Sequence, residues 1–210
     1  MNDIHAFYIN LDERLDRKAS VEMELSKITC RYERVSAIKH DIPPIGCAMS
    51  HIKCLELAKE RNLPQVLIVE DDMMWVGNDI RNKIDSLRSH DFNVAVLGPL
   101  FESGATVIKV NHYFVTNTTC QTTVAYLCSD KYYDIWLEKL NESIAEMLNG
   151  GSTDIHAIDQ SWKLLQKRDS GWLFAYPPIC KQRPGYSNIL GAHVDYGELY
   201  ERKLNVLTDT

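Results

Sequence analysis

The chain has 210 residues, of which 45% are hydrophobic and 25% are charged, so a single domain can bury a core without disulfides or structural metals. Its formal net charge is -6, which argues against a nucleic-acid partner, because general nucleic-acid binders carry a basic face. No stretch approaches the roughly 20 consecutive apolar residues of a membrane-spanning helix. Peripheral contact with a membrane stays open.

The six cysteines are scattered, with neither a C-x-x-C pair nor the Cys/His spacing of a zinc site. We therefore expect reduced thiols that serve mostly as small core residues. The N-terminus lacks the basic start and long apolar run of a signal peptide. These features predict a cytoplasmic location, either bacterial or in the cytosol of a virus-infected host. The C-terminal sequence YERKLNVLTDT has no obvious end signal, so further domains of a longer chain stay open.

Strand-like and helix-like patterns alternate through the first half of the chain. The run QVLIV is typical of a strand buried on both faces, and the segment before it repeats apolar residues at helical spacing. This rhythm predicts an α/β fold with a mainly parallel sheet. We expect strands at 4–9, 31–38, 65–69 and 93–98, a helix at 15–28 that buries Leu15, Val21, Leu25 and Ile28, and a helix at 46–62 that buries Ala48, Ile52, Leu55 and Ala58.

The second half is more mixed. Three short segments resemble antiparallel or edge strands, and two longer ones have the apolar spacing of helices. An irregular segment at 178–197 follows a last strand-like run. We expect strands at 106–110, 112–116, 122–128 and 172–177, a helix at 129–148 with Ser129 as N-cap and Tyr133, Leu137, Leu140, Ile144 and Met147 inward, and a helix at 154–168 using Ile155, Ile158, Trp162 and Leu165.

The sequence LIVEDDMMW, residues 67–75, sets Glu70, Asp71 and Asp72 between two apolar runs. Uncompensated carboxylates beside a core cost several kcal/mol each. The acids begin where a strand ends, at the edge where open α/β sheets bind ligands. If the extended geometry continues, Glu70 and Asp72 point to one side and Asp71 to the other, so that two carboxylates suit a hard divalent cation. The same pattern also fits an acidic turn that only caps the next element.

Two enzyme classes place acids in this way. A Mg2+-dependent phosphohydrolase would use Asp71 or Asp72 as nucleophile, and it typically shows D-x-D followed by small residues. A nucleotide-sugar transferase uses D-x-D or a variant such as E-x-D to hold a metal on the donor's diphosphate. Here Glu70 comes first and bulky Met73, Met74 and Trp75 follow, which favours the transferase.

Several stretches, in order between about residues 5 and 190, resemble glycosyltransferase family 25, the lipooligosaccharide and collagen galactosyltransferase group. The resemblance implies a GT-A (nucleotide-diphospho-sugar transferase, Rossmann-like) fold, with a mainly parallel mixed sheet flanked by helices. It implies one catalytic domain, residues 1–210, with a nucleotide-sugar-binding half (about 1–100) and an acceptor-side half (about 101–210). The matching stretches are FYINLDERLDRK, RVSAI, IGCAMSHIKCLELA, VLIVEDD, TTVAYLCSDK, AIDQSWKLL and PPICKQRPGYSNI.

The implied reaction moves a hexose from a UDP-sugar, UDP-galactose or UDP-glucose, to a glycan or glycoprotein acceptor. It inverts the anomeric centre and usually needs Mn2+ (or Mg2+). Glu70 and Asp72 would hold the metal, with the late histidine His193 as a third ligand. The implied donor-binding residues are Asn10, Leu11, Arg14, Arg17, Ala37, Ser50, His51, Asp71, Gln182 and Ser187.

Simpler explanations fit some of these residues as well. Arg14 and Arg17 could grip a phosphate with a bidentate fork, or merely belong to a solvated helix start. Ser50 and His51 fit a purely structural pair, and Lys53 fits a plain surface lysine as well as a counter-charge to the acids.

An inverting transfer also needs a general base for the acceptor hydroxyl. We expect Asp159 in that role, with Asp154 as a substitute that also fits a helix cap. Trp162, Trp172 and Tyr186 could stack on a sugar ring, although the helical spacing of Trp162 also fits the core. A nucleotide-sugar-binding domain without turnover remains an alternative function.

Overall fold

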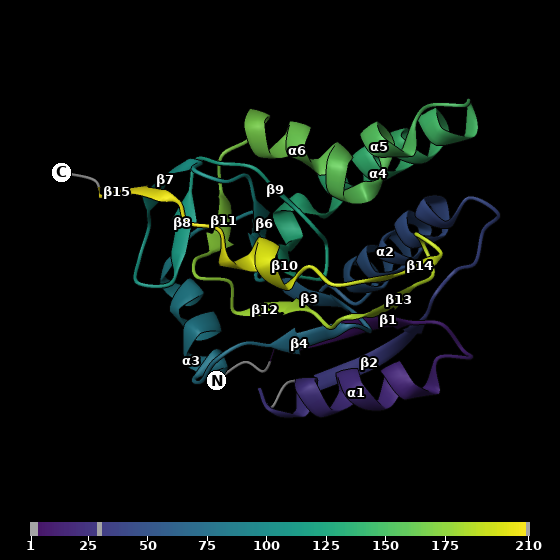
Figure 1. Ribbon diagram of the computed structural model, residues 1–210, viewed down its shortest axis with the longest axis horizontal. Coiled ribbons are helices and arrows are strands. Elements are labelled where there is room, and N and C mark those ends of the chain that lie inside the picture. Colours follow the sequence, from purple (N-terminus) through teal and green to yellow (C-terminus); the bar gives the residue numbers. More distant parts are fainter. Residues whose placement is uncertain (1–3, 29–30, 209–210) are drawn as a thin grey trace.

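The computed structural model describes residues 4–28 and 31–208, and these form a mixed α/β structure (Figure 1). Within these residues no helix is long and apolar enough to cross a membrane. The helices are α1 (Leu15–Ser26), α2 (Pro43–Glu60), α3 (Ile80–Asp85), α4 (Tyr133–Leu148), α5 (Thr153–His156) and α6 (Ile158–Arg168), with 3-10 turns η1 (Ser86–Ser89), η2 (Asp130–Tyr132) and η3 (Gly197–Glu201).

A nine-stranded sheet runs through the middle of the molecule in the order β15-β7-β8-β11-β5-β10-β3-β1-β2. Strands β8 and β10 run against the other seven, so the sheet is mixed but mostly of one direction. The predicted fold class is confirmed. The strands are β1 (His5–Asn10), β2 (Arg31–Ser36), β3 (Gln65–Glu70), β5 (Val94–Val96), β7 (Thr106–Lys109), β8 (Phe114–Thr116), β10 (Ala125–Ser129), β11 (Trp172–Ala175) and β15 (Asn205–Leu207).

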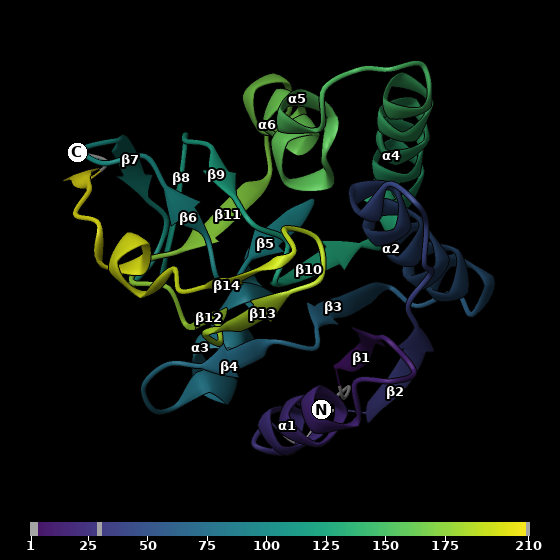
Figure 2. The same cartoon turned by 45° about the vertical axis from the view of Figure 1, so that its right-hand side comes forward.

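Three small two-stranded sheets complete the fold, and two of them involve the segment expected to be irregular. Strand β12 (Cys180–Gln182) pairs with β4 (Met73–Trp75), and β4 is the strand that directly follows the three acidic residues. Strands β13 (Gly185–Ser187) and β14 (Ala192–Val194) form a hairpin, and β6 (Leu100–Phe101) pairs with β9 (Cys120–Gln121). The pairing of β12 with β4 brings the segment of β12 to β14, yellow-green in Figures 1 and 2, beside the carboxyl end of β3, whereas the last strand, β15, pairs with β7 at the far edge of the sheet.

Two buried clusters cover the two faces of the sheet. Residues of β3 alternate between them: Val66 and Ile68 join the cluster that contains the buried faces of α2, α4 and α6, whereas Leu67 and Val69 join the cluster under α1 and α3. The period of two in a strand explains this division, and it agrees with the prediction of a strand buried on both faces. Figure 1 shows the two helical layers on opposite sides of the sheet.

The helix boundaries differ from the sequence-based expectation in two places. Helix α2 begins at Pro43, because a proline in the first turn lacks only an N–H that would have no helical partner. The helix expected at 154–168 breaks at Ala157, whose extended backbone (φ -57, ψ 150) separates α5 from α6. The break shifts the helical phase, so Ile155 is 63% exposed while Ile158 and Trp162 are buried.

Two further details of the predicted helices were wrong. Leu15 is the first residue of α1 and is 69% exposed, because the buried face of the helix begins later, with Val21. Ser129 precedes the 3-10 turn η2 and makes no side-chain capping hydrogen bond, and α4 starts only at Tyr133.

Candidate active site

The polar residues that follow β1 and β3 meet at one edge of the sheet. Helix α1 follows β1 on one face, and α2 leads into β3 on the other, so the winding reverses between these neighbouring strands. Open α/β sheets bind ligands at such a reversal, outside the carboxyl ends of the strands. Ile9 pairs with Glu70 across the two strands, and Asn10 Nδ2 donates to Asp71 Oδ2 at 2.8 Å.

A cavity of about 370 Å³ opens at this edge. Every predicted donor-binding residue except Arg14 lines it, from Asn10 after β1 to Ser187 in the hairpin. Arg14 lies beside the cavity instead: its guanidinium pairs with Asp16 and donates to Asn188 Oδ1 at 3.0 Å, and Asn188 does line the cavity. The lining residues outside the prediction include Glu13, Lys39, His40, Cys47, Asn188 and Ile189.

Arg17 is the cation that holds two of the three acids. Its NH1 atom donates to Asp71 Oδ1 at 2.8 Å and lies 3.3 Å from Asp72 Oδ2, while NH2 donates to the Tyr186 carbonyl oxygen at 2.7 Å. The predicted alternation, with Asp71 facing away from Asp72, is therefore wrong. Strand β3 ends at Glu70, and both aspartates lie in the turn before β4, where the period of two no longer applies.

Glu70 has different partners. Thr123 Oγ1 donates to Glu70 Oε1 at 2.7 Å, and His51 Nε2 lies 3.5 Å from the same oxygen. Burial by itself would raise the pKa of Glu70, but the His51 ring and the Thr123 hydroxyl outweigh burial and lower it. The family-like stretch TTVAYLCSDK contains Thr123, but nothing in that pattern assigned the residue a role at the site. It reaches the site because β10, which pairs with β3, begins two residues after it.

Asp72 holds its proton most strongly. Burial raises the pKa of Asp72 to about 7, and the negative charge of Glu70 adds to the rise. Burial also raises the pKa of Asp71, although Arg17 and Asn10 oppose it. Asp72 Oδ1 is buried and has no hydrogen-bond partner among the residues that the structure describes. The single guanidinium of Arg17 therefore does not neutralise all three carboxylates, and the site can accept a further cation.

Asp159, in the first turn of α6, is electrostatically linked to the acids. Burial raises the pKa of Asp159, and the charge of Glu70 raises it further, whereas a hydrogen bond with the Thr122 backbone opposes the rise. Asp154 does not join them: it lies exposed in the first turn of α5, where its backbone N–H donates to the Ser152 hydroxyl. Of the two predicted candidates for a base, exposure separates Asp154 from the acids, whereas Asp159 is close enough for the charge of Glu70 to act on it, although it does not line the cavity.

The acidic turn lies within a segment that matches a known protein family. The model of glycosyltransferase family 25 (LPS biosynthesis protein) matches residues 43–147, which is 105 of the 210 residues and runs from α2 to α4. The chain belongs to glycosyltransferase family 25. This confirms the resemblance seen in the sequence, and no curated protein matches the chain in a sequence search.

A solved structure resembles this family 25 chain in fold. A crystal structure of a glycosyltransferase involved in the glycosylation of the major capsid of PBCV-1 superposes with a TM-score of 0.53 and 6% identity, over 95% of this chain and 98% of that chain. At that identity the likeness concerns the fold alone. A mannose-1-phosphate geranyltransferase from Thermus thermophilus superposes with a TM-score of 0.43 and 9% identity, over 83% of this chain and 74% of that chain.

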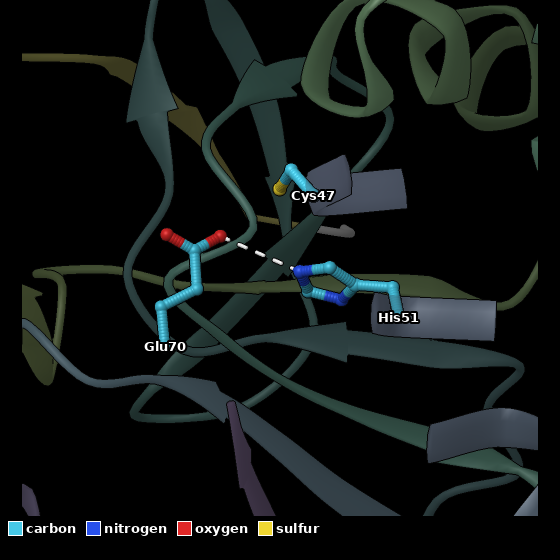
Figure 3. A group of neighbouring side chains, drawn as sticks. All are labelled: Cys47, His51 and Glu70. Atoms are coloured by element: carbon cyan, nitrogen blue, oxygen red, sulfur yellow. Dashed lines mark ion pairs between the residues drawn. The ribbon is translucent and has the colours of Figure 1, made fainter. Parts of the chain in front are cut away.

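The predicted metal ligands are only partly brought together in this family 25 chain. Glu70 and Asp72 both line the cavity, and the charge of Glu70 acts on Asp72. His193 lies exposed in β14 and does not line the cavity. Its ring forms a T-shaped contact with the Tyr186 ring, with 5.6 Å between the ring centroids. Within residues 4–28 and 31–208, the group of His, Cys, Asp and Glu atoms close enough to hold a metal consists of Cys47, His51 and Glu70 (Figure 3).

The remaining candidates divide between core and surface. Trp162 and Trp172 are buried and pack edge to face at 5.5 Å, so they belong to the core. Tyr186 is 43% exposed beside the cavity and stays available to a ligand. Lys53 is an exposed residue of α2 that does not line the cavity.

Sequence reasoning missed Tyr196. Burial raises its pKa, and the charges of Asp159, Asp72 and Glu70 raise it further, which indicates that its hydroxyl lies near the acids. It lies in the closing segment, without a motif that would have marked it.

Proposed function

We propose that the chain transfers a hexose from a UDP-sugar, UDP-galactose or UDP-glucose, to a hydroxyl of a glycan or glycoprotein acceptor, with inversion and with Mn2+ or Mg2+. One observation carries the proposal: three acids meet at the reversal of the sheet, beside a cavity of about 370 Å³, with one guanidinium between two of them. The cavity volume is within the usual range for small-molecule sites.

Glu70 and Asp72 would hold the cation. Carboxylate oxygens are the ligands that Mn2+ and Mg2+ prefer, and the buried Asp72 Oδ1 lacks a partner among the described residues. When bound, the cation would supply positive charge to the diphosphate as it leaves. Asp71, fixed by Asn10 and Arg17, would accept hydrogen bonds from hydroxyl groups of the donor.

Asp159 fits the role of general base. Its raised pKa brings it closer to neutral pH, where proton transfer from a hydroxyl is most efficient. In the proposed step the acceptor oxygen bonds to the anomeric carbon, the bond from that carbon to the phosphate oxygen breaks, and the hydroxyl proton passes to Asp159. UDP leaves with the bonding electron pair.

The first experiment measures donor binding and slow donor hydrolysis across a panel of nucleotide sugars. Because a ligand of the native state raises the unfolding temperature by mass action, a UDP-hexose should raise it with Mn2+ present and less in EDTA. Equal shifts from all nucleotides, or no shift at millimolar UDP-sugar with Mn2+, would contradict the proposal.

Two variants test the roles of the acids. Asp72→Asn should abolish the Mn2+-dependent part of the shift and of the hydrolysis, whereas Asp91→Asn, at a side chain that is 93% exposed, should change neither. Asp159→Asn should keep Mn2+-dependent donor binding but lose transfer to an acceptor.

The alternative functions give different results in the same assays. Phosphate release from a phosphomonoester, lost in Asp71→Asn or Asp72→Asn, would indicate a phosphohydrolase. UDP binding with neither hydrolysis nor transfer across the panel would indicate a binding domain without turnover.

A further inference from the structure

A cluster of three different ligand types lies at the cavity, beside the pair of acids to which we assign the donor's cation. Cys47 and His51 are four residues apart on one face of α2, and Glu70 ends β3. One ligand atom from each, the thiol sulfur, an imidazole nitrogen and a carboxylate oxygen, lies within 4.8 Å of the other two. Figure 3 shows the three side chains converging on one point.

His51 provides independent evidence that this point is meant for a ligand. The residue is 0% exposed, yet its Nε2 atom has no hydrogen-bond partner in the part of the chain that the structure describes. Its ion-pair contact with Glu70 Oε1, at 3.5 Å, does not amount to a hydrogen bond. Buried ring nitrogens are normally hydrogen-bonded, so a nitrogen left with only this long ion pair, and placed beside a thiol, is suited to a further ligand.

His51 and Glu70 each have a hydrogen-bond partner of the kind that orients metal ligands. His51 Nδ1 lies 2.9 Å from the Tyr126 hydroxyl oxygen, which can accept a hydrogen bond from Nδ1 and leave Nε2 free to bind a metal. The Thr123 hydroxyl holds the Glu70 carboxylate. Such outer contacts orient metal ligands and fix the tautomer of a ligating histidine.

The spacing fits a tetrahedral ion with little movement. Metal–ligand bonds of about 2.0–2.3 Å at tetrahedral angles separate the ligand atoms by about 3.3–3.8 Å. The distance from His51 Nε2 to Glu70 Oε1 is already 3.5 Å. The thiol, which is not in a disulfide, lies within 4.8 Å of both other atoms, so it has to approach by at most about 1–1.5 Å, which a small side-chain rotation allows.

We propose that Cys47, His51 and Glu70 bind a borderline-soft divalent cation of the Zn2+ class, with the fourth position open to the cavity. Thiolate and imidazole ligands favour Zn2+ over Mn2+ and Mg2+, which prefer sites made of oxygen. All three residues line the cavity, so the ion has an entry path. Binding releases the Cys47 thiol proton to solvent, because the thiolate is the ligand.

Glu70 is shared with the donor's cation, and this consequence rests on the proposed function. An ion held by Cys47 and His51 would turn the Glu70 carboxylate away from Asp72. Zn2+ should therefore inhibit the transferase, and excess Mn2+ should reverse the inhibition only in part, since the thiolate binds Mn2+ weakly.

Co2+ provides a direct probe of the site in the whole chain, without UDP-sugar. A thiolate bound to Co2+ gives sulfur-to-metal charge-transfer absorption in the near ultraviolet, and tetrahedral geometry gives strong visible bands. We expect one Co2+ per chain with both features, and their loss when one equivalent of Zn2+ displaces it. Absence of the charge-transfer band, or a band from octahedral Co2+ alone, overturns the proposal.

Two matched variants locate the site on α2. Cys47→Ala and Cys54→Ala each remove one thiol from the same helix, but Cys54 is a core residue outside the cluster. Cys54→Ala should keep the Co2+ spectrum. Cys47→Ala should lose the charge-transfer band and bind Zn2+ at least about 10–100-fold more weakly, a loss that even mutations of outer contacts cause.

Cys47→Ser, which keeps the side-chain size, replaces Cys47→Ala if the latter does not fold, with the same expected loss. An unchanged spectrum in either Cys47 variant overturns the assignment. The site and the proposed function can fail separately. If this protein shows the Co2+–thiolate band but no UDP-sugar turnover, only the proposed function is refuted. If it transfers sugar but lacks the band, only the metal site is refuted.

Discussion

Replacing Asp72 by asparagine should make the metal-free protein more stable at neutral and alkaline pH, although it should abolish the response to Mn2+. Asparagine has nearly the shape of a protonated aspartic acid and carries no charge. It still offers an oxygen to Arg17, which lies 3.3 Å from Asp72 Oδ2. The substitution therefore removes the repulsion between Asp72 and Glu70 and keeps most of the packing.

The magnitude follows from the difference in pKa between the folded and unfolded states. The pKa of Asp72 is raised to about 7, chiefly by burial, whereas an unfolded aspartic acid titrates near 3.9. The folded state therefore binds more protons than the unfolded state in this interval, and stability falls as the pH rises, by about 1.4 kcal/mol per unit for one proton. From pH 5 to about pH 7 the wild type should lose about 2 kcal/mol through this group.

Solvent reduces that figure, because 17% of the Asp72 side chain is exposed and Arg17 can follow the charge. We expect the stability advantage of Asp72→Asn to grow by about 1–3 kcal/mol between pH 5 and pH 8. For a chain of this size each kcal/mol corresponds to about 2–4 °C in the unfolding temperature. The difference between variant and wild type should thus widen by about 2–12 °C.

Thermal unfolding in EDTA, followed by circular dichroism from pH 5 to pH 8, measures this difference. Asp91→Asn, at a solvent-exposed acid, is the matched control and should track the wild type at every pH. A constant difference between Asp72→Asn and wild type over the whole range would refute the reasoning, because it would mean that Asp72 is already ionised in the folded protein at pH 5.

Three further substitutions test the architecture of the site. Arg17→Lys should lower stability by about 1–3 kcal/mol and weaken donor binding, since a lysine cannot serve Asp71, Asp72 and the Tyr186 carbonyl together; an unchanged unfolding temperature would count against the role of the guanidinium. Tyr126→Phe should cost about 1–3 kcal/mol in denaturant unfolding, because buried His51 and Trp136 lose their shared hydroxyl partner, whereas the exposed Tyr32→Phe should stay within about 0.5 kcal/mol. Gly46→Ala should lower both the unfolding temperature and donor affinity. The added Cβ would overlap the Ile38 carbonyl oxygen and lie 3.2 Å from the His40 backbone nitrogen, and both Ile38 and His40 line the cavity. Full stability and affinity in this variant would show that the cavity wall shifts without cost.

Local patterns were sufficient for much of the fold. The alternation of QVLIV between the two buried clusters and the apolar spacing of α2 reflect periods of two and 3.6, which are properties of the backbone itself. The same patterns failed where the backbone changed conformation without a strong residue signal. Ala157 interrupts a helix although alanine favours one, and Asp71 and Asp72 leave the strand alternation as soon as β3 ends.

The candidate site divides in the same way. The sequence by itself determined that Glu70, Asp71 and Asp72 follow a buried strand, and hence that they lie at the ligand-binding edge of the sheet. Only the tertiary structure decided their partners, because these come from elements far along the chain. Arg17 is 54 residues from Asp71, and Thr123 is 53 residues from Glu70.

The charges of the three acids depend on those distant partners and on burial, neither of which a local pattern contains. Glu70 keeps its charge beside His51 and Thr123, while Asp72, buried and next to that charge, holds its proton. The approach of Cys47 and His51 to Glu70 has the same origin. The sequence showed no recognised zinc spacing, because the third ligand is set only by the packing of α2 against β3.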